Sequence, residues 1–307
     1  MAYYGCEVTM RSIAIVGPTA SGKTELAVRV MERWPIFEAV SVDSMTVYRE
    51  FTVGTAKPTP EELRGKPYHL VSIVSVEDEF SLGSFLRAVD AVRSDLRCRT
   101  RLALFVGGTS LYLRAIIDGV MPPPRYLGLR YWLEILGTYV EPKMLYDLLR
   151  SVDPQAAAKI ESNNLRRTIR ALEVSFGSAG LQSVYGGAFL ETRLSDVLQF
   201  GIDLPREVLY QRIEDRIKMQ LESGWVDEVE KILQSGAELS RTAAQAIGYK
   251  ELMSFLKGEM SYDEAVYMTV SRTKNLAKRQ LAWLRRDKRI YWGADVNEVF
   301  ELIAKRF

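Results

Sequence analysis

An eight-residue segment near the N-terminus, Gly17–Thr24, has residue types and a spacing that suit phosphate chemistry. It reads G-P-T-A-S-G-K-T and fits the pattern G-x-x-x-x-G-K-[ST]. In such a loop, backbone N–H groups surround phosphate oxygens at a helix N-terminus, where the helix dipole also favours an anion. Lys23 adds a positive charge, and the hydroxyl of Thr24 can bind Mg²⁺.

We therefore predict a phosphate or diphosphate site with Mg²⁺ as the cofactor. The predicted loop consists of Gly17, Pro18, Thr19, Ala20, Ser21, Gly22, Lys23 and Thr24. The alternative is a glycine-rich turn without a ligand. The loop alone does not distinguish hydrolysis, phosphoryl transfer and simple diphosphate binding.

Two further positions follow predicted strands and could act on a bound phosphate compound. The Asp43 carboxylate could contact Mg²⁺ through water or accept a proton from a nucleophile. A helix cap or a ribose ligand are its alternatives. Thr109 follows Gly107 and Gly108, which let the backbone approach a substrate closely. Its alternative is to cap a helix over 111–117.

The elements that must position these residues alternate in the manner of a parallel sheet. Apolar, β-branched segments predict strands, and amphipathic segments between them predict helices. Strands are expected at 12–16, 37–42, 69–74, 102–106, 199–204 and 289–292, and the first helices at 23–34 and 82–97. Ligands of open α/β sheets bind outside the carboxyl ends of the strands. Gly17, Asp43 and Thr109 should therefore meet at one crevice.

A helical insertion interrupts this alternation. It begins at Pro122, ends near Ser195, and contains helices predicted at 131–136, 143–150 and 164–176. We therefore expect a core made of 1–121 and 196–307, and an inserted subdomain at 122–195. The core continues with helices predicted at 206–223, 225–234, 241–256 and 262–286.

The composition is that of an ordinary globular protein. The 307 residues are 47% hydrophobic and 26% charged, and the net charge of +2 gives no general attraction to nucleic acid. Two cysteines, Cys6 and Cys98, and a single histidine exclude a local zinc cluster and indicate a reducing, cytoplasmic compartment. Residues 1–10 lack the features of a secretory signal. The longest apolar run, 102–113, is shorter than the ~20 residues of a membrane span.

A basic segment near the C-terminus, 272–289, predicts a surface for RNA. It contains one acid, Asp287, and these basic residues: Arg272, Lys274, Lys278, Arg279, Arg285, Arg286, Lys288 and Arg289. Basic side chains follow phosphates, and the aromatic residues Trp283, Tyr291 and Trp292 could stack on unpaired bases. A solvated helix face is the alternative. Arg166, Arg167 and Arg170 in the insertion offer a second patch.

Several segments, in order along nearly the whole chain, resemble the tRNA dimethylallyltransferase family. They are V-D-S-M-T-V-Y-R from Val42, G-T-A-K-P from Gly54, V-G-G-T-S-L-Y from Val106, N-N-L-R-R-T-I-R-A-L-E-V from Asn163, Q-A-I-G-Y-K-E from Gln245 and A-K-R-Q-L-A-W-L-R from Ala277. The resemblance implies an α/β fold with a P-loop NTPase-like parallel sheet core and an inserted all-helical subdomain that binds tRNA. It also implies transfer of a dimethylallyl group from dimethylallyl diphosphate to N6 of the adenosine 3′-adjacent to the anticodon, with release of diphosphate.

The resemblance assigns roles to individual residues. The P-loop becomes a diphosphate cradle, in which Lys23 and Mg²⁺ at Thr24 neutralise the leaving group. Asp43 accepts a hydrogen bond or proton from the attacking amine, and Thr109 lies where donor and acceptor meet. Arg216 contacts the diphosphate. Arg212, one helical turn earlier, shares its predicted face, and its alternative is an ion pair with Glu207 or Asp215.

The implied partners are the tRNA anticodon stem-loop and dimethylallyl diphosphate, without a membrane, and we expect a monomer because no exposed apolar stripe is evident. The predicted tRNA contacts are Asp43, Ser44, Met45, Thr46, Thr109, Arg130, Arg166, Arg167, Arg170, Gln245, Gly248, Tyr249, Lys250, Lys278 and Arg279.

The chain departs from the family pattern in places. Thr46 stands where a glutamine is usual, Tyr68 replaces the first histidine of a common pair, and Ser110 replaces a frequent glycine. The Thr46 difference bears on how bases flanking the target are read. The remaining histidine, His69, is expected to be structural.

Three rival functions share part of the signal. A small-molecule P-loop kinase would have the loop and Asp43, but it would not need a basic C-terminal surface. An adenylate isopentenyltransferase that uses free nucleotide would lack the insertion. A non-catalytic RNA-binding P-loop module would have no reason to combine Lys23, Thr24 and Asp43.

Overall fold

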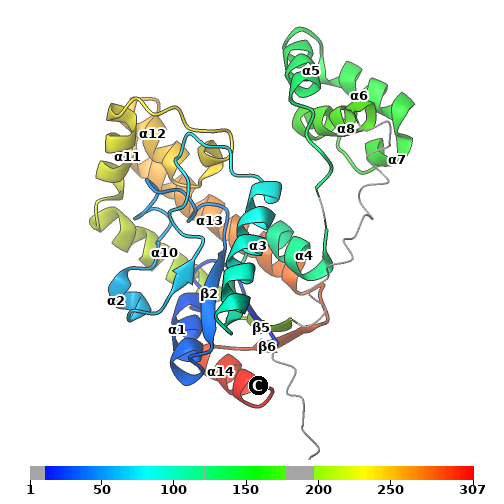
Figure 1. Ribbon diagram of the computed structural model, residues 1–307. Helices are drawn as coiled ribbons and strands as arrows, with labels where there is room; N and C mark the ends of the chain where they lie inside the picture. Colours follow the sequence, from blue (N-terminus) through cyan, green and yellow to red (C-terminus); the bar gives the residue numbers. More distant parts are fainter. Residues whose placement is uncertain (1–10, 121, 178–196) are drawn as a thin grey trace, which may run out of the picture. The chain divides into compact units, whose positions relative to one another are not determined.

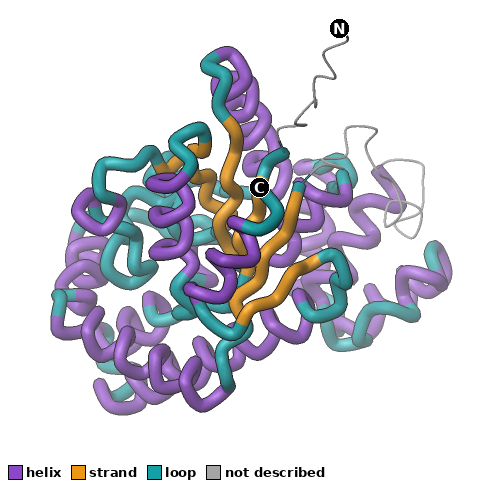
Figure 2. Tube along the Cα trace, turned by 90° about the horizontal axis from the view of Figure 1, so that it is seen from below, coloured by secondary structure: helices purple, strands orange, loops and turns teal. Residues whose placement is uncertain are grey.

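The core of the protein is a six-stranded, all-parallel sheet with strand order β3-β2-β4-β1-β5-β6 (Figures 1 and 2). The computed structural model describes residues 11–120, 122–177 and 197–307. The strands are β1 (Ile13–Val16), β2 (Phe37–Val42), β3 (Tyr68–His69), β4 (Leu102–Gly107), β5 (Leu198–Ile202) and β6 (Ile290–Gly293). Every residue of β1 and β2 is buried, as expected for central parallel strands covered on both faces.

Helices cover both faces of this sheet. The helices are α1 (Lys23–Arg33), α2 (Pro60–Leu63), α3 (Leu82–Cys98), α4 (Ser110–Asp118), α5 (Leu127–Tyr139), α6 (Pro142–Val152), α7 (Pro154–Ala157), α8 (Leu165–Gly177), α10 (Arg206–Glu222), α11 (Trp225–Gln234), the short 3₁₀ turn η1 (Ala243–Gln245), α12 (Tyr249–Leu256), α13 (Tyr262–Leu284) and α14 (Val296–Ala304). The connections β1–α1–β2 and β3–α3–β4 run in opposite directions across the sheet. Because parallel crossovers are right-handed, α1 and α3 lie on opposite faces, and α14 packs beside α1 (Figure 1).

The chain divides into two compact units, one formed by residues 1–113 and 195–307 and the other by residues 114–194. The second unit has its own core, in which α5, α6 and α8 bury Leu133, Leu149 and Leu172. Among the described residues, no helix is long and apolar enough to cross a membrane.

Two expectations about secondary structure were wrong. The strand predicted at 69–74 ends at His69, because Leu70 and Ser72 adopt left-handed backbone angles, with φ of 62° and 56°, that no strand accommodates. The helix predicted at 241–256 is broken into η1 and α12. Gly248, with φ of 88°, separates them and caps α12. Helix α14 was not anticipated.

Candidate functional site

The loops that follow β1, β2 and β4 line one cavity of about 640 Å³. Val16 and Val42 both lie in register with Gly107, so the carboxyl ends of the three strands are adjacent. Lys23, Asp43 and Thr109 therefore line the same space, as the strand order requires. Side chains from α10, α12 and α13 form the other walls.

The P-loop holds an unusual backbone shape that leads into α1. Ala20 has φ of 62° and Gly22 has φ of 95°, and a left-handed alanine is uncommon outside tight functional turns. The Nζ of Lys23 donates to the carbonyl oxygen of Pro18 at 2.5 Å. Burial, together with the positive charge of nearby Arg216, lowers the pKa of Lys23 to about 7, and Asp43 opposes both effects. An anion bound beside Lys23 would therefore favour the protonated, positively charged form of this lysine.

One carboxylate oxygen of Asp43 accepts hydrogen bonds from the backbone of its own loop, and the residue lines the cavity. Its Oδ1 accepts the N–H groups of Met45 at 2.7 Å and Thr46 at 3.2 Å, so the capping alternative is partly realised. Among the described residues, no hydrogen bond reaches Oδ2. The carboxylate is therefore held in place by the backbone while one oxygen is available to a substrate.

The turn after β4 is packed so closely that its glycines are required. A Cβ on Gly107 would lie 2.2 Å from the Val42 carbonyl oxygen, and one on Gly108 would lie 2.5 Å from that of Gly17. The next residue, Thr109, lines the cavity, and its carbonyl accepts the N–H of Leu113 at the start of α4. Thr109 thus starts a helix and also lines the site.

The two arginines of α10 differ in position. Arg216 lines the cavity and donates from Nη2 to the carbonyl oxygen of Thr55 at 3.1 Å. Burial lowers its pKa, and Asp43 opposes that shift. Arg212 is exposed and does not line the cavity. Within the described chain it forms no ion pair with Glu207 or Asp215, and Asp215 instead accepts from the Gln211 amide.

The loop around Gly54 depends on a residue that sequence reasoning missed. Glu228 of α11 accepts the N–H groups of Thr52, Val53 and Gly54 and the hydroxyl of Tyr249. These contacts place the Thr55 carbonyl against Arg216. An acid among the apolar positions of an amphipathic helix was the available signal, but its partners lie far away in sequence.

Several predicted tRNA contacts also line the cavity. Those that do are Asp43, Ser44, Met45, Thr46, Thr109, Gln245, Tyr249 and Arg279. Tyr249 is 1% exposed, stacks on Phe51 with ring centroids 3.8 Å apart, and donates its hydroxyl to Glu228. It is therefore part of the wall. Gly248 is packed against Trp225, whereas Lys250 and Lys278 are exposed and do not line the cavity.

Half of the basic C-terminal segment is already paired within the protein. Ion pairs join Arg272 to Glu251, Lys274 to Glu214, Arg285 to Asp203 and Arg289 to Asp287. For the part of the chain that is described, no ion pair involves the remaining four residues, which are exposed: Lys278, Arg279, Arg286 and Lys288. The segment itself contains one acidic residue, which suggested that its basic side chains were unpaired. Three of the four acidic partners, however, come from other segments of the chain.

The helical unit likewise uses two of its predicted tRNA contacts internally. Arg130 and Arg170 both pair with Glu173, which is fully buried, and Arg170 also donates to the Pro123 carbonyl oxygen. Of the tRNA contacts predicted in the helical unit, only Arg166 and Arg167 are exposed. The structure thus gives Arg130 and Arg170 a structural role that the sequence did not predict.

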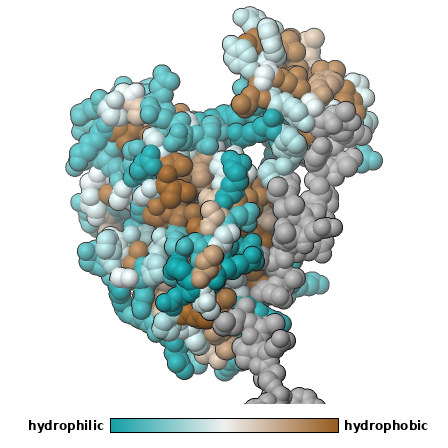
Figure 3. Space-filling view, in the orientation of Figure 1, coloured by the Kyte–Doolittle hydropathy of each residue, from teal (hydrophilic) through white to brown (hydrophobic). Residues whose placement is uncertain are grey.

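The same unit exposes apolar side chains, which the sequence analysis had not expected (Figure 3). The exposed residues of α5 are Leu127, Tyr131, Trp132, Leu136 and Tyr139. The prediction that no apolar stripe is exposed was therefore wrong. The monomer itself stays a prediction.

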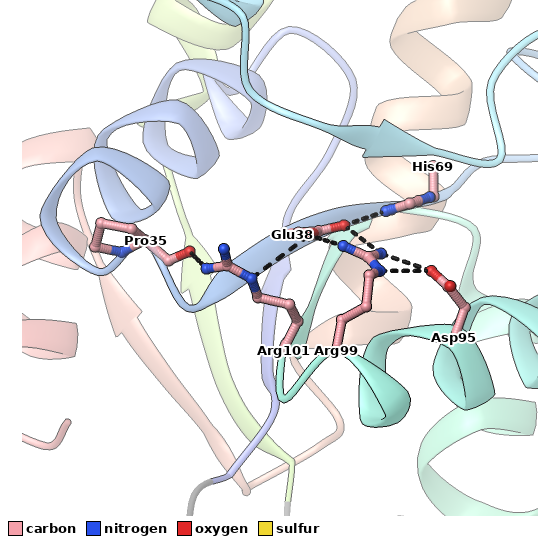
Figure 4. A network of polar contacts seen from close by, with 6 residues as sticks. All are labelled: Pro35, Glu38, His69, Asp95, Arg99 and Arg101. Atoms are coloured by element: carbon pink, nitrogen blue, oxygen red, sulfur yellow. Dashed lines mark hydrogen bonds and ion pairs between the residues drawn. The ribbon is translucent and has the colours of Figure 1, made fainter.

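A second polar cluster surrounds Glu38 of β2 (Figure 4). Arg99 donates to both carboxylate oxygens at 2.5 and 3.0 Å, and His69 Nε2 lies 2.7 Å from Oε2. The Arg99 hydrogen bonds lower the pKa of Glu38, although burial opposes them. His69 thus lies in a network that ties β3 and the end of α3 to β2.

The oxygen donors near the P-loop suit a cation that is held mainly by its substrate. Among the described residues, no group of three or more His, Cys, Asp or Glu side chains is placed to hold a metal ion. Thr24 and Asp43 both line the cavity. Mg²⁺ commonly binds through one or two protein oxygens together with substrate phosphates, so these residues fit it.

Comparison with known proteins agrees with this architecture. Residues 46–287 match the IPP transferase family, and residues 10–72 match a family described as isopentenyl transferase. The tRNA dimethylallyltransferase of Thermomicrobium roseum is 39% identical, over 91% of this chain and 85% of its own. That of Carboxydothermus hydrogenoformans is 38% identical, over 96% of this chain and 95% of its own.

Solved structures match over the same extent. The full-length tRNA isopentenylpyrophosphate transferase of Bacillus halodurans has a TM-score of 0.70 at 34% identity, covering 96% of both chains. A eukaryotic dimethylallyltransferase, solved in snapshots of its action on tRNA, has a TM-score of 0.80 at 25% identity, covering 97% of this chain and 77% of its own. The resemblance predicted from the motifs is confirmed: this chain belongs to the IPP transferase family, with the tRNA dimethylallyltransferases.

Proposed function

We propose that this protein transfers a dimethylallyl group from dimethylallyl diphosphate to N6 of the adenosine 3′-adjacent to the anticodon of tRNA. One observation carries the proposal: a phosphate-binding loop, a carboxylate and a threonine line the same cavity. The loop suits a diphosphate, and the carboxylate suits an amine placed beside it. The family membership supports the tRNA reaction over the kinase and free-nucleotide alternatives.

The residues divide the work between the two substrates. The P-loop amides, Lys23 and Arg216 hold the donor diphosphate and stabilise the charge that grows as its C–O bond breaks. When bound at Thr24, Mg²⁺ adds positive charge to the same leaving group. The amine of the adenine forms the new N–C bond, and its proton passes to Oδ2 of Asp43. Diphosphate and N6-dimethylallyladenosine are the products.

An exocyclic amine is a weak nucleophile because its lone pair is conjugated with the purine ring. Leaving-group stabilisation therefore carries much of the barrier, and the cluster of Lys23 and Arg216 supplies it. In the ligand-free protein, burial and the positive charge of Arg216 both lower the pKa of Lys23. A bound diphosphate would offset both effects and favour the charged lysine.

Each of the two units has exposed basic residues that would contact tRNA phosphates. Lys278 and Arg279 of α13 are exposed, and Arg279 also lines the cavity. Arg166 and Arg167 of the helical unit are a second exposed pair. Phosphate contacts of this kind position the RNA, and the adenine must leave its stack to reach Asp43.

The test uses the purified chain with Mg²⁺, dimethylallyl diphosphate and either a tRNA transcript or free AMP. Mass spectrometry of digested RNA should show N6-dimethylallyladenosine next to the anticodon, with no requirement for ATP. Asp43→Asn should lower turnover by about 10² or more and leave donor binding largely unchanged. Asp215→Asn, at an exposed position of α10, is the control. Modification of AMP in preference to tRNA, or dependence on ATP hydrolysis, would overturn the proposal.

A further inference from the structure

The side chain of Gln280 in α13 joins the P-loop to the turn after β4 that contains Gly108. Gln280 is half-buried and lines the cavity. Its Oε1 accepts the N–H of Thr19 at 3.0 Å, and its Nε2 donates to the carbonyl oxygen of Gly108 at 3.1 Å. The two backbone groups belong to different loops, one after β1 and the other after β4.

We infer that Gln280 is a positioning residue that sets the distance between the donor diphosphate and the acceptor amine. This inference rests on the proposed function. In that reaction the P-loop holds one substrate, while the Gly107–Thr109 turn lies where the other arrives. A single planar amide that bonds to both loops keeps them in one geometry before either substrate binds.

The chemistry of the bridge requires a primary amide. Thr19 offers a donor and Gly108 offers an acceptor, so the bridging group must accept with one atom and donate with its neighbour. A glutamate could serve Thr19 but has no donor for Gly108. A methionine of similar length could serve neither.

The Gln280 amide can approach the turn after β4 only because residue 108 is a glycine. A Cβ at Gly108 would lie 2.7 Å from Nε2 of Gln280 and 2.5 Å from the carbonyl oxygen of Gly17. No side chain at 108 is compatible with this bridge. The absence of a side chain at Gly108 thus leaves room for both the P-loop backbone and the Gln280 amide.

The position of Gln280 on α13 connects the bridge to the proposed RNA surface. Its neighbour Arg279 is exposed and lines the cavity, and Lys278 is exposed beside it. Contacts that RNA makes with this part of α13 therefore act on the element that carries the bridge. Loss of the bridge should affect the chemical step more than the affinity for either substrate, because small displacements of reacting groups cost rate.

The experiment compares Gln280→Met and Gln280→Glu with the wild type. The matched control is Gln234→Met, which removes an exposed amide of α11 whose hydrogen bond within the described chain is to Glu230. Amide hydrogen exchange of the P-loop is measured in the ligand-free protein, and kcat and both KM values are measured with tRNA and donor. The exchange measurement does not depend on the reaction.

In Gln280→Met, exchange at Thr19 should be about tenfold faster or more, and kcat should fall by about 10- to 100-fold. In Gln280→Glu, the carboxylate still accepts from Thr19, so its exchange should stay slow while kcat falls similarly. KM values should change by less than about threefold in Gln280→Met, which introduces no charge beside the phosphate loop, and Gln234→Met should match the wild type. Unchanged Thr19 exchange in Gln280→Met, or near-normal kcat in both variants, would overturn the inference. A wild type that modifies no tRNA would instead refute the proposed function.

Discussion

Binding of the donor should draw a proton from solution, because Lys23 is largely neutral without it. Burial and the neighbouring Arg216 lower its pKa to about 7 in the ligand-free protein. At pH 8 a lysine with that pKa is about nine-tenths neutral. A diphosphate bound beside it favours the charged form and returns the pKa toward or above its ordinary value of about 10.4.

The expected uptake is therefore about 0.9 proton per site at pH 8, about 0.5 at pH 7 and about 0.1 at pH 6. The donor does not obscure this signal at pH 8, because phosphate monoesters lose their last proton near pH 6. Affinity should accordingly weaken by almost tenfold for each pH unit above 8, until Lys23 would be neutral in both states.

The assay is calorimetric titration of the protein with dimethylallyl diphosphate and Mg²⁺ in the absence of tRNA, so that no turnover occurs. Buffers of equal pH but different ionisation enthalpy are compared, and the slope of the observed enthalpy gives the protons taken up. Phosphate buffers are avoided because they compete for the loop. Lys23→Met should show a slope near zero, and Lys250→Met, at an exposed position, should match the wild type.

The Arg216→Met variant tests the second cause of the shift. Removing that charge should raise the pKa of Lys23 and reduce the uptake at pH 8, even though the donor also binds less tightly. A wild-type slope of zero at pH 8, with normal affinity, would refute the reasoning, because it would mean that Lys23 is charged in the free protein.

Three other substitutions test the surroundings of the site. Glu38→Gln should reduce the free energy of unfolding by about 1–3 kcal/mol in urea denaturation, since it breaks charged hydrogen bonds of a buried carboxylate. Because the folded pKa of Glu38 is lowered, its contribution is present above its unfolded value and is lost as pH falls through the folded value, so the wild type and Glu38→Gln should converge in acid. Arg279→Glu should weaken tRNA binding and flatten its salt dependence by about 0.7–0.9 in log–log slope, without loss of stability. Arg285→Glu should instead destabilise the fold, because Arg285 is paired with Asp203; equal effects of the two reversals on tRNA binding would contradict this division.

The sequence predicted the sheet and the three loops of the site because their signals are local. A glycine-rich loop between a strand and a helix, and an aspartate at a strand end, are visible within a few residues. The strand order then brings Lys23, Asp43 and Thr109 to one cavity by general rules of α/β sheets. The prediction of a strand at 69–74 was wrong because Leu70 and Ser72 adopt left-handed backbone angles, and no glycine at these positions indicates such a conformation in the sequence.

What the sequence did not predict depends on pairings between distant segments. The ion pairs that neutralise Arg272 and Lys274 come from α12 and α10, and no local charge count reveals them. The same holds for Glu228, whose backbone partners lie in the Gly54 loop, and for the two bonds of Gln280. Local patterns predicted residues that line the cavity, and only the fold showed what holds them in place.

The costs of this arrangement are concentrated in the P-loop. Ala20 has a left-handed backbone, the buried Ser21 hydroxyl has no hydrogen-bond partner among the described residues, and Lys23 is desolvated beside Arg216. Each of these features destabilises the ligand-free protein, and together they form the surface that a diphosphate would contact. The buried strands that flank the loop supply the stability that permits this strain. A diphosphate bound at the loop would offset the desolvation of Lys23 and its repulsion by Arg216.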